Sequence, residues 1–128
     1  MAKFEIKDGV AIIPEGTTMI KTKTFKDCTW LKGVIIPASV TEIEANAFCR
    51  CTSLESIVVL EGNPVYVSRE SCNAIIETKT NTLISGCKST VIPESVVEIG
   101  KSAFYDCTSL ESIVIPESVA VIGEWAFK

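Results

Sequence analysis

The sequence predicts a mostly β solenoid, in which short coils of the chain stack on one another. The dipeptide Ile-Pro recurs at a spacing of 23 residues, first at Pro14 and Pro37 and later at Pro93 and Pro116. The octapeptide CTSLESIV occurs twice, at residues 51–58 and at residues 107–114. A coil of 23 residues cannot bury its own apolar side, and it becomes stable only when neighbouring coils cover that side.

Several columns of identical or similar residues support this alignment. Phenylalanine recurs once in each of four coils, and leucine and isoleucine recur at fixed distances from it. These columns contain Phe25, Phe48, Phe104 and Phe127; Leu31, Leu54 and Leu110; and Ile20, Ile43, Ile99 and Ile122. A fixed period of 20 to 30 residues with leucine-spaced aliphatic side chains is typical of a leucine-rich repeat, and it predicts that these columns form the core.

A single domain accounts for the whole chain, residues 1–128, as about five coils. Pro37 and Pro93 are 56 residues apart, so one coil of 23 residues and one of 33 separate them. The extra residues fall in the fourth unit, where NAIIETKTNTLIS predicts a β-hairpin near residues 73–86 with its turn at TKTN. The opening FEIKDGVAII predicts a short hairpin that caps the first coil. The final IGEWAFK stops before the cysteine and leucine of its unit.

The motif IPESVVEIGKSAFYDCTSLESIVIPESVAVIG resembles the BspA-like class of bacterial leucine-rich repeats. The segment NPVYVSRESCNAIIETKTNTLISGCKSTVIP also resembles an insertion common in that family. The resemblance covers about residues 10–128. It implies a right-handed solenoid with one parallel β-sheet, a short helical, 3₁₀ or irregular convex side, and little helix. It also implies secreted or cell-surface proteins engaged in adhesion and protein binding, without naming a ligand.

Alternation along the predicted strands places one β-branched residue per coil on the outer side of the sheet. This apolar stripe contains Ile35, Val58, Val91 and Val114, and small residues, including Ser56 and Ser112, lie beside it. Contiguous exposed apolar patches tend to mark interaction sites, although an exposed β-branched row also simply satisfies strand propensity. A neighbouring column alternates in charge, so Lys32 should face Glu55 and Lys88 should face Glu111.

The hairpin of the fourth unit is the second candidate contact region. We expect it either to cover one flank of the solenoid or to serve as an arm for binding or dimerisation. Loops inserted on one side of a solenoid often carry recognition. The candidate contact residues are Ile76, Lys79, Thr80 and Leu83.

The six cysteines do not predict a metal site. Cys28, Cys51 and Cys107 follow the repeat and are expected in the core, where cysteine behaves as a small apolar residue. Cys49 and Cys51 form a C-x-C pair without the second cluster that zinc needs. Cys72 and Cys87 lie at the two ends of the predicted hairpin. They either form a cross-strand disulfide or remain two buried thiols.

Composition favours a binding module over an enzyme. The chain contains no histidine, no phosphate-binding loop and no G-x-S-x-G motif, and we predict no catalysis and no cofactor. Its net charge of −4 argues against binding to nucleic acid. No apolar run is long enough to insert into a membrane. The first residues lack the pattern of a signal peptide, so the residues alone also leave a cytoplasmic location open.

Two functions from different classes follow. In the first, the solenoid recognises a protein or surface ligand through its sheet face or its hairpin. In the second, the chain is a structural protein that self-assembles, as a homo-oligomer, through exposed coil ends or through the apolar stripe. The incomplete last coil indicates either that the array continues beyond this sequence or that two chains pair end to end.

Overall fold

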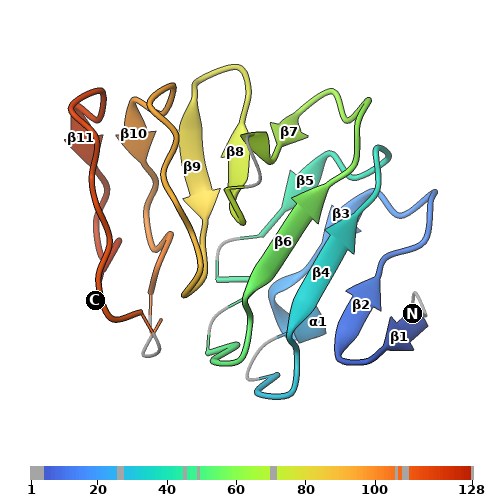
Figure 1. The fold of residues 1–128 in the computed structure, drawn as a ribbon. Helices are drawn as coiled ribbons and strands as arrows, with labels where there is room; N and C mark the ends of the chain where they lie inside the picture. The colour runs from blue at the N-terminus through green and yellow to red at the C-terminus, as the bar shows by residue number, and fades with distance from the viewer. Residues whose placement is uncertain are drawn as a thin grey trace.

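The computed structural model describes residues 5–25, 28–44, 46–48, 50–69, 72–105, 107 and 110–127. The chain forms a mostly β solenoid whose coils lie side by side from the N-terminus to the C-terminus (Figure 1). Its helix content in the described part is one short helix, α1 (Thr22–Phe25). No helix among the described residues is long and apolar enough to span a membrane.

The first three coils build a regular front sheet. This sheet has the strand order β1-β2-β4-β6, with β1 (Glu5–Lys7), β2 (Val10–Ile12), β4 (Gly33–Ile36) and β6 (Ser56–Val59). Strands β2, β4 and β6 are parallel, and the 23-residue repeat sets their register, which pairs Ile12 with Ile35 and Ile35 with Val58. Strand β1 pairs antiparallel with β2, as the predicted N-terminal hairpin requires.

A second ladder runs along another side of the coils, and the fourth unit divides it. Strands β3 (Met19–Ile20) and β5 (Glu42–Ile43) form a two-stranded sheet. Beyond them lies a five-stranded sheet with the order β11-β10-β9-β8-β7. Its strands are β7 (Tyr66–Val67), β8 (Ile75–Glu77), β9 (Thr82–Ser85), β10 (Glu98–Ile99) and β11 (Val121–Ile122).

The expectation of one parallel sheet is therefore wrong, because the described chain forms three sheets, two of which contain antiparallel pairs. The fourth unit causes the interruption at the front. Beside β6, the side chains of Asn73 and Ser68 accept hydrogen bonds from the backbone of Ile57 and Val59. These side chains occupy the place where the next strand of the ladder would pair.

The predicted hairpin is present but does not protrude. Strands β8 and β9 pair antiparallel around a turn at residues 78–81, and β9 then pairs in parallel with β10. The hairpin thus lies inside the five-stranded sheet, between β7 and β10 (Figure 1). The reason is that both of its strands carry fully buried aliphatic residues, which the coils on either side cover.

The core consists of two clusters that meet at β8. Ile75 belongs to the N-terminal cluster with Phe25, Leu31 and Leu54, whereas the next residue, Ile76, belongs to the C-terminal cluster with Phe104. Most residues of the repeated columns predicted for the core are buried in the inner coils, whereas Ile43 and Leu110 are half-buried. In the last coil, Ile122 and Phe127 are 51% and 40% exposed.

Asn63 fixes the point at which the chain leaves the regular coil. Its side-chain amide donates hydrogen bonds to the carbonyl oxygens of Pro37 and Val40, at 3.1 and 2.9 Å. Its side-chain oxygen accepts hydrogen bonds from the backbone of Val65 and Tyr66, at 2.9 and 2.8 Å. The Asn63 side chain therefore links the segment after β4, which contains Pro37 and Val40, to the start of β7.

Candidate functional site

The apolar stripe lies on the front of the solenoid, and its exposure increases toward the C-terminus. Ile35 is half-buried between its neighbours in β2 and β6, and the exposed fractions of Val58, Val91 and Val114 are 39%, 71% and 83%. The regular ladder buries the flanks of each side chain on a strand. Val91 and Val114 lie outside the assigned strands, so less of their surface is covered.

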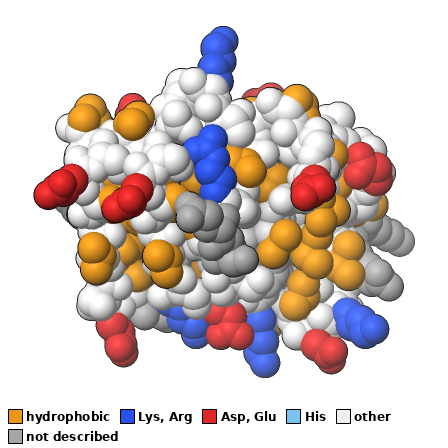
Figure 2. All heavy atoms as spheres, turned by 45° about the horizontal axis from the view of Figure 1, so that its top comes forward, with side chains coloured by type: hydrophobic (Ala, Val, Ile, Leu, Met, Phe, Trp, Pro, Cys, Tyr) orange, Lys and Arg blue, Asp and Glu red, His pale blue; other side chains and the backbone are white. Residues whose placement is uncertain are grey.

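Small side chains next to the stripe keep this face shallow. Ser56 is half-buried and Ser112 is exposed. An open groove beside the last two coils is lined by the stripe residues Val91 and Val114 together with Ser112 and Pro116. Figure 2 shows hydrophobic side chains gathered where β4 and β6 lie, and further groups over the last coils. The face offers a partner a broad apolar contact with little depth.

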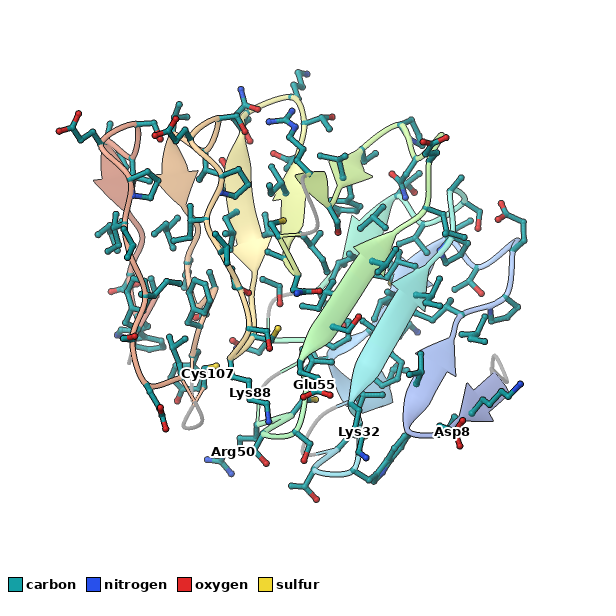
Figure 3. The ribbon with its side chains drawn as sticks, in the orientation of Figure 1. Asp8, Lys32, Arg50, Glu55, Lys88 and Cys107 are labelled. Atoms are coloured by element: carbon teal, nitrogen blue, oxygen red, sulfur yellow. The ribbon has the colours of Figure 1, made fainter. Side chains whose placement is uncertain are left out.

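A row of charges of alternating sign borders the same face. Figure 3 shows Asp8, Lys32, Glu55 and Lys88 along the lower edge of the sheet. Lys32 and Glu55 are neighbours, because the backbone of Glu55 donates a hydrogen bond to the carbonyl of Lys32 at 2.8 Å. Within the described part of the chain, no ion pair joins Lys32 to Glu55 or Lys88 to Glu111. The alternation prevents like charges from stacking and leaves the edge polar.

Two of the four hairpin residues predicted to contact a partner are buried. Ile76 and Leu83 have no exposed surface, so the prediction that they contact a partner is wrong. Both side chains pack into the C-terminal cluster, because β8 and β9 lie inside a sheet. Lys79 and Thr80 are exposed at the turn, where the Thr80 hydroxyl donates a hydrogen bond to the Glu77 carboxylate at 2.7 Å.

Cys72 and Cys87 are free, buried thiols, and no disulfide joins them. The Cys87 thiol lies 3.4 Å from the carbonyl oxygen of Asn73, and burial raises the pKa of both thiols. Of the repeated cysteines, Cys51 is buried and Cys107 is half-buried. Cys49 lies outside the described residues. Among the residues that are described, no three potential ligands gather as a metal site.

A cavity on the convex side was not anticipated from the sequence. It has a volume of about 250 Å³, and both Phe48 and Phe104 line it. It lies at the fourth unit, which has five residues from Leu83 through Cys87 where the preceding unit has twelve from Ile43 through Leu54. This difference in length is the signal in the sequence that could have predicted the cavity.

Residues 74–128 match the family model described as "BspA type Leucine rich repeat region (6 copies)". This C-terminal part of the chain is therefore similar to BspA-type leucine-rich repeats. The matched region begins within the irregular fourth unit, so the hairpin strands β8 and β9 fall within the BspA-type repeats. None of the curated proteins matches the chain.

Solved structures of bacterial proteins share the fold of these BspA-type repeats. A leucine-rich repeat protein from Eubacterium ventriosum superimposes with a TM-score of 0.71 at 25% identity, over 91% of this chain and 32% of that one. A leucine rich cell surface protein from Faecalibacterium prausnitzii gives a TM-score of 0.64 at 28% identity, over 92% of this chain and 38% of that one. The pneumococcal vaccine antigen PcpA, at 24% identity, has a similar fold, with a TM-score of 0.61 over 76% of this chain and 25% of its own.

These likenesses confirm the leucine-rich repeat solenoid as the fold class. The chain spans about a third of the length of the two structures that it covers most fully. Leucine-rich repeats are commonly protein-interaction modules. Solenoids of this kind present their stacked strands as an extended surface.

Proposed function

We propose that the chain is a non-enzymatic, adhesion-type module that binds a protein or surface ligand through the apolar stripe on the front of the solenoid. The observation that carries this proposal is the high exposure of Val58, Val91 and Val114, at 39%, 71% and 83%. A folded protein rarely leaves exposed β-branched residues in successive coils on one face unless another surface contacts them. Ser56 and Ser112 would let the partner's backbone approach closely.

The rigidity of the solenoid supports a binding role for this face. Val58 lies on β6, whose neighbour β4 is held by a continuous parallel ladder. Valine side chains have few rotamers, so contact with a partner restricts little additional motion. We place the protein at the cell surface or in secreted form, because one similar structure is that of a leucine rich cell surface protein.

The test exchanges the stripe for charge and measures binding to immobilised extracellular matrix proteins, namely fibronectin, laminin and collagen. Val58→Lys combined with Val114→Lys should reduce the bound fraction at least tenfold on any matrix protein that binds the parent chain. The matched control, Val97→Lys with Val121→Lys, alters side chains that are 43% and 51% exposed beside β10 and on β11, outside the front sheet. Equal binding by both double variants, or no binding by the parent chain, would contradict this proposal.

A second function, self-association, is favoured by the apolar surface of residues 116–127. Val121, Ile122 and Trp125 are each 51% exposed in this coil. If this surface joins two copies, light scattering at rising concentration will show a dimer. Val121→Glu with Ile122→Glu will return the protein to a monomer. A parent chain that remains monomeric at millimolar concentration contradicts the assembly function.

A further inference from the structure

The phenylalanine column forms two stacked pairs with an interruption between them. The rings of Phe25 and Phe48 stack with their centroids 5.4 Å apart, and those of Phe104 and Phe127 stack at 5.1 Å. Among the described aromatic residues, Phe48 and Phe104 do not stack on each other. The fourth unit contributes no aromatic residue to this column, because its short path from Leu83 to Cys87 omits the convex turn that carries phenylalanine elsewhere.

The cavity of about 250 Å³ occupies the place of the omitted turn. Its walls include Phe48, Cys51 and Leu54 from the segment before β6. They also include Gly86, Phe104 and Cys107 from the C-terminal half of the chain. A cavity of about 150 Å³ with apolar walls is large enough to hold benzene. The space at the fourth unit is therefore large enough for one aromatic side chain.

Gly86 shapes the wall of this cavity. A Cβ atom added to Gly86 would clash with Cε1 and Cζ of Phe104, so the absence of a side chain at Gly86 lets the ring approach the backbone there. The Phe104 ring is thereby held in place by Gly86 and by its stacking partner Phe127. Offset stacking between aromatic rings contributes about 0.5–1.5 kcal/mol beyond the burial of apolar area.

Exposed polar side chains surround the apolar walls. Glu44, Asn46, Arg50 and Lys101 line the cavity and are exposed, with charges of both signs. Such a rim suits the backbone amides of a polypeptide, which offer both hydrogen-bond donors and acceptors. A free hydrocarbon ring would use only the walls.

We propose that this cavity is a binding site for one aromatic side chain, phenylalanine or tyrosine, of a partner polypeptide. The guest ring completes the interrupted phenylalanine column. This site lies on the convex side and is independent of the apolar stripe at the front, so it adds a second anchor to the chain.

The test titrates the intact protein with N-acetyl-phenylalaninamide and follows the signals of the Gly86 amide and the Phe48 and Phe104 rings by NMR. We expect saturable shifts at these signals, and no saturation with N-acetyl-leucinamide or with toluene. Equal responses to the leucine and phenylalanine compounds would contradict the proposal. Binding of toluene without the blocked amino acid would also contradict it, because the cavity would then take free aromatic molecules.

Variants locate the site and keep the test independent of folding defects. Phe104→Leu retains apolar volume but removes a ring from the wall, and it should weaken binding about two- to tenfold. The matched control, Trp30→Leu, alters an aromatic side chain that is 47% exposed and does not line the cavity. Its affinity should stay within twofold of the parent. Ser85→Phe places a ring at the cavity from within the chain and should abolish the titration, whereas equal affinity in all three variants would contradict the site.

Discussion

At the scale of single residues, the close approach of the Phe104 ring to Gly86 leaves no room for a side chain at residue 86. Gly86→Ala would force a Cβ atom against Cε1 of the Phe104 ring. Overpacking of this kind destabilises a protein by about 1–3 kcal/mol. We expect a decrease of that size in the free energy of unfolding, measured by urea titration. The control Ser85→Ala, at the neighbouring residue, should change it by less than about 0.5 kcal/mol.

The raised pKa values of one tyrosine hydroxyl and three thiols predict how the stability of the fold depends on pH. Burial raises the pKa of the thiols of Cys72, Cys87 and Cys107, and burial also raises the pKa of the Tyr66 hydroxyl. The folded chain therefore holds these protons more tightly than the unfolded chain does. Their contribution is fully present at neutral pH and is lost as the pH rises past the ordinary thiol value of about 8.5. Urea unfolding between pH 7 and pH 9.5 should show a falling free energy of unfolding.

A double variant separates the thiol contribution from other titrations. Replacing Cys72 and Cys87 with alanine removes two of the raised groups, and the decrease of stability with pH should become smaller. An unchanged pH dependence in this variant would show that other groups cause the decrease. A free energy of unfolding that stays constant up to pH 9.5 in the parent chain would contradict the prediction itself.

At the scale of elements, Asn63 connects the irregular fourth unit to the regular coils. Its side chain makes four hydrogen bonds, two as donor and two as acceptor. Asn63→Ala leaves the backbone groups of Pro37, Val40, Val65 and Tyr66 without these partners. At about 1 kcal/mol for each net hydrogen bond, we expect a loss of about 2–4 kcal/mol in the free energy of unfolding. The control Glu61→Ala, at an exposed residue, should have almost no effect, and equal losses in both variants would contradict the role of Asn63.

The hairpin shows what local pattern predicts and what it does not. The β-branched runs on either side of TKTN correctly predicted β8, the turn and β9. They did not predict that the hairpin lies inside a sheet, because pairing with β10 depends on contacts between residues far apart in the sequence. Two adjacent isoleucines, Ile75 and Ile76, were the available signal, since they supply both core clusters. Deleting the hairpin would therefore remove part of each core.

At the scale of the whole molecule, coverage decreases toward the last coil, and this predicts a gradient of local stability. The amides of Glu44, Gly100 and Gly123 occupy equivalent places on three coils and donate to carbonyls of the preceding ladder residues, at 2.9, 2.8 and 2.7 Å. Ile122, beside Gly123, is 51% exposed. Opening the last coil exposes little additional apolar surface, so it requires less free energy than opening an inner coil.

Hydrogen exchange can measure this gradient directly. After correction for intrinsic rates, we expect the protection factor of Gly123 to be at least about tenfold below that of Glu44, with Gly100 closer to Glu44. Because the three hydrogen bonds have nearly the same length, bond geometry does not explain such a difference. Equal protection at the three amides would indicate that the solenoid opens as a single cooperative unit.

The repeat predicted the solenoid because every coil buries its apolar side in the same way. Residues of one column, such as Leu31 and Leu54, therefore lie at equivalent places in the core. The interruption of the sheets could not be predicted from columns, since it arises in the one unit that departs from them. The same holds for the candidate sites. The stripe residues Val58 and Val114 follow the period and could be predicted, whereas the cavity between Phe48 and Phe104 exists only because a turn is absent.

The antiparallel pairs β7–β8 and β8–β9 reverse the direction of the chain twice within one unit. Two reversals restore the original direction, and β9 therefore meets β10 in parallel, as β3 meets β5. The coils before and after the insertion therefore run in the same direction, as they would if the insertion were absent. A unit of this kind can stand at any joint of such an array without reorienting the coils that follow. The coils after the interruption therefore keep the orientation of the coils before it.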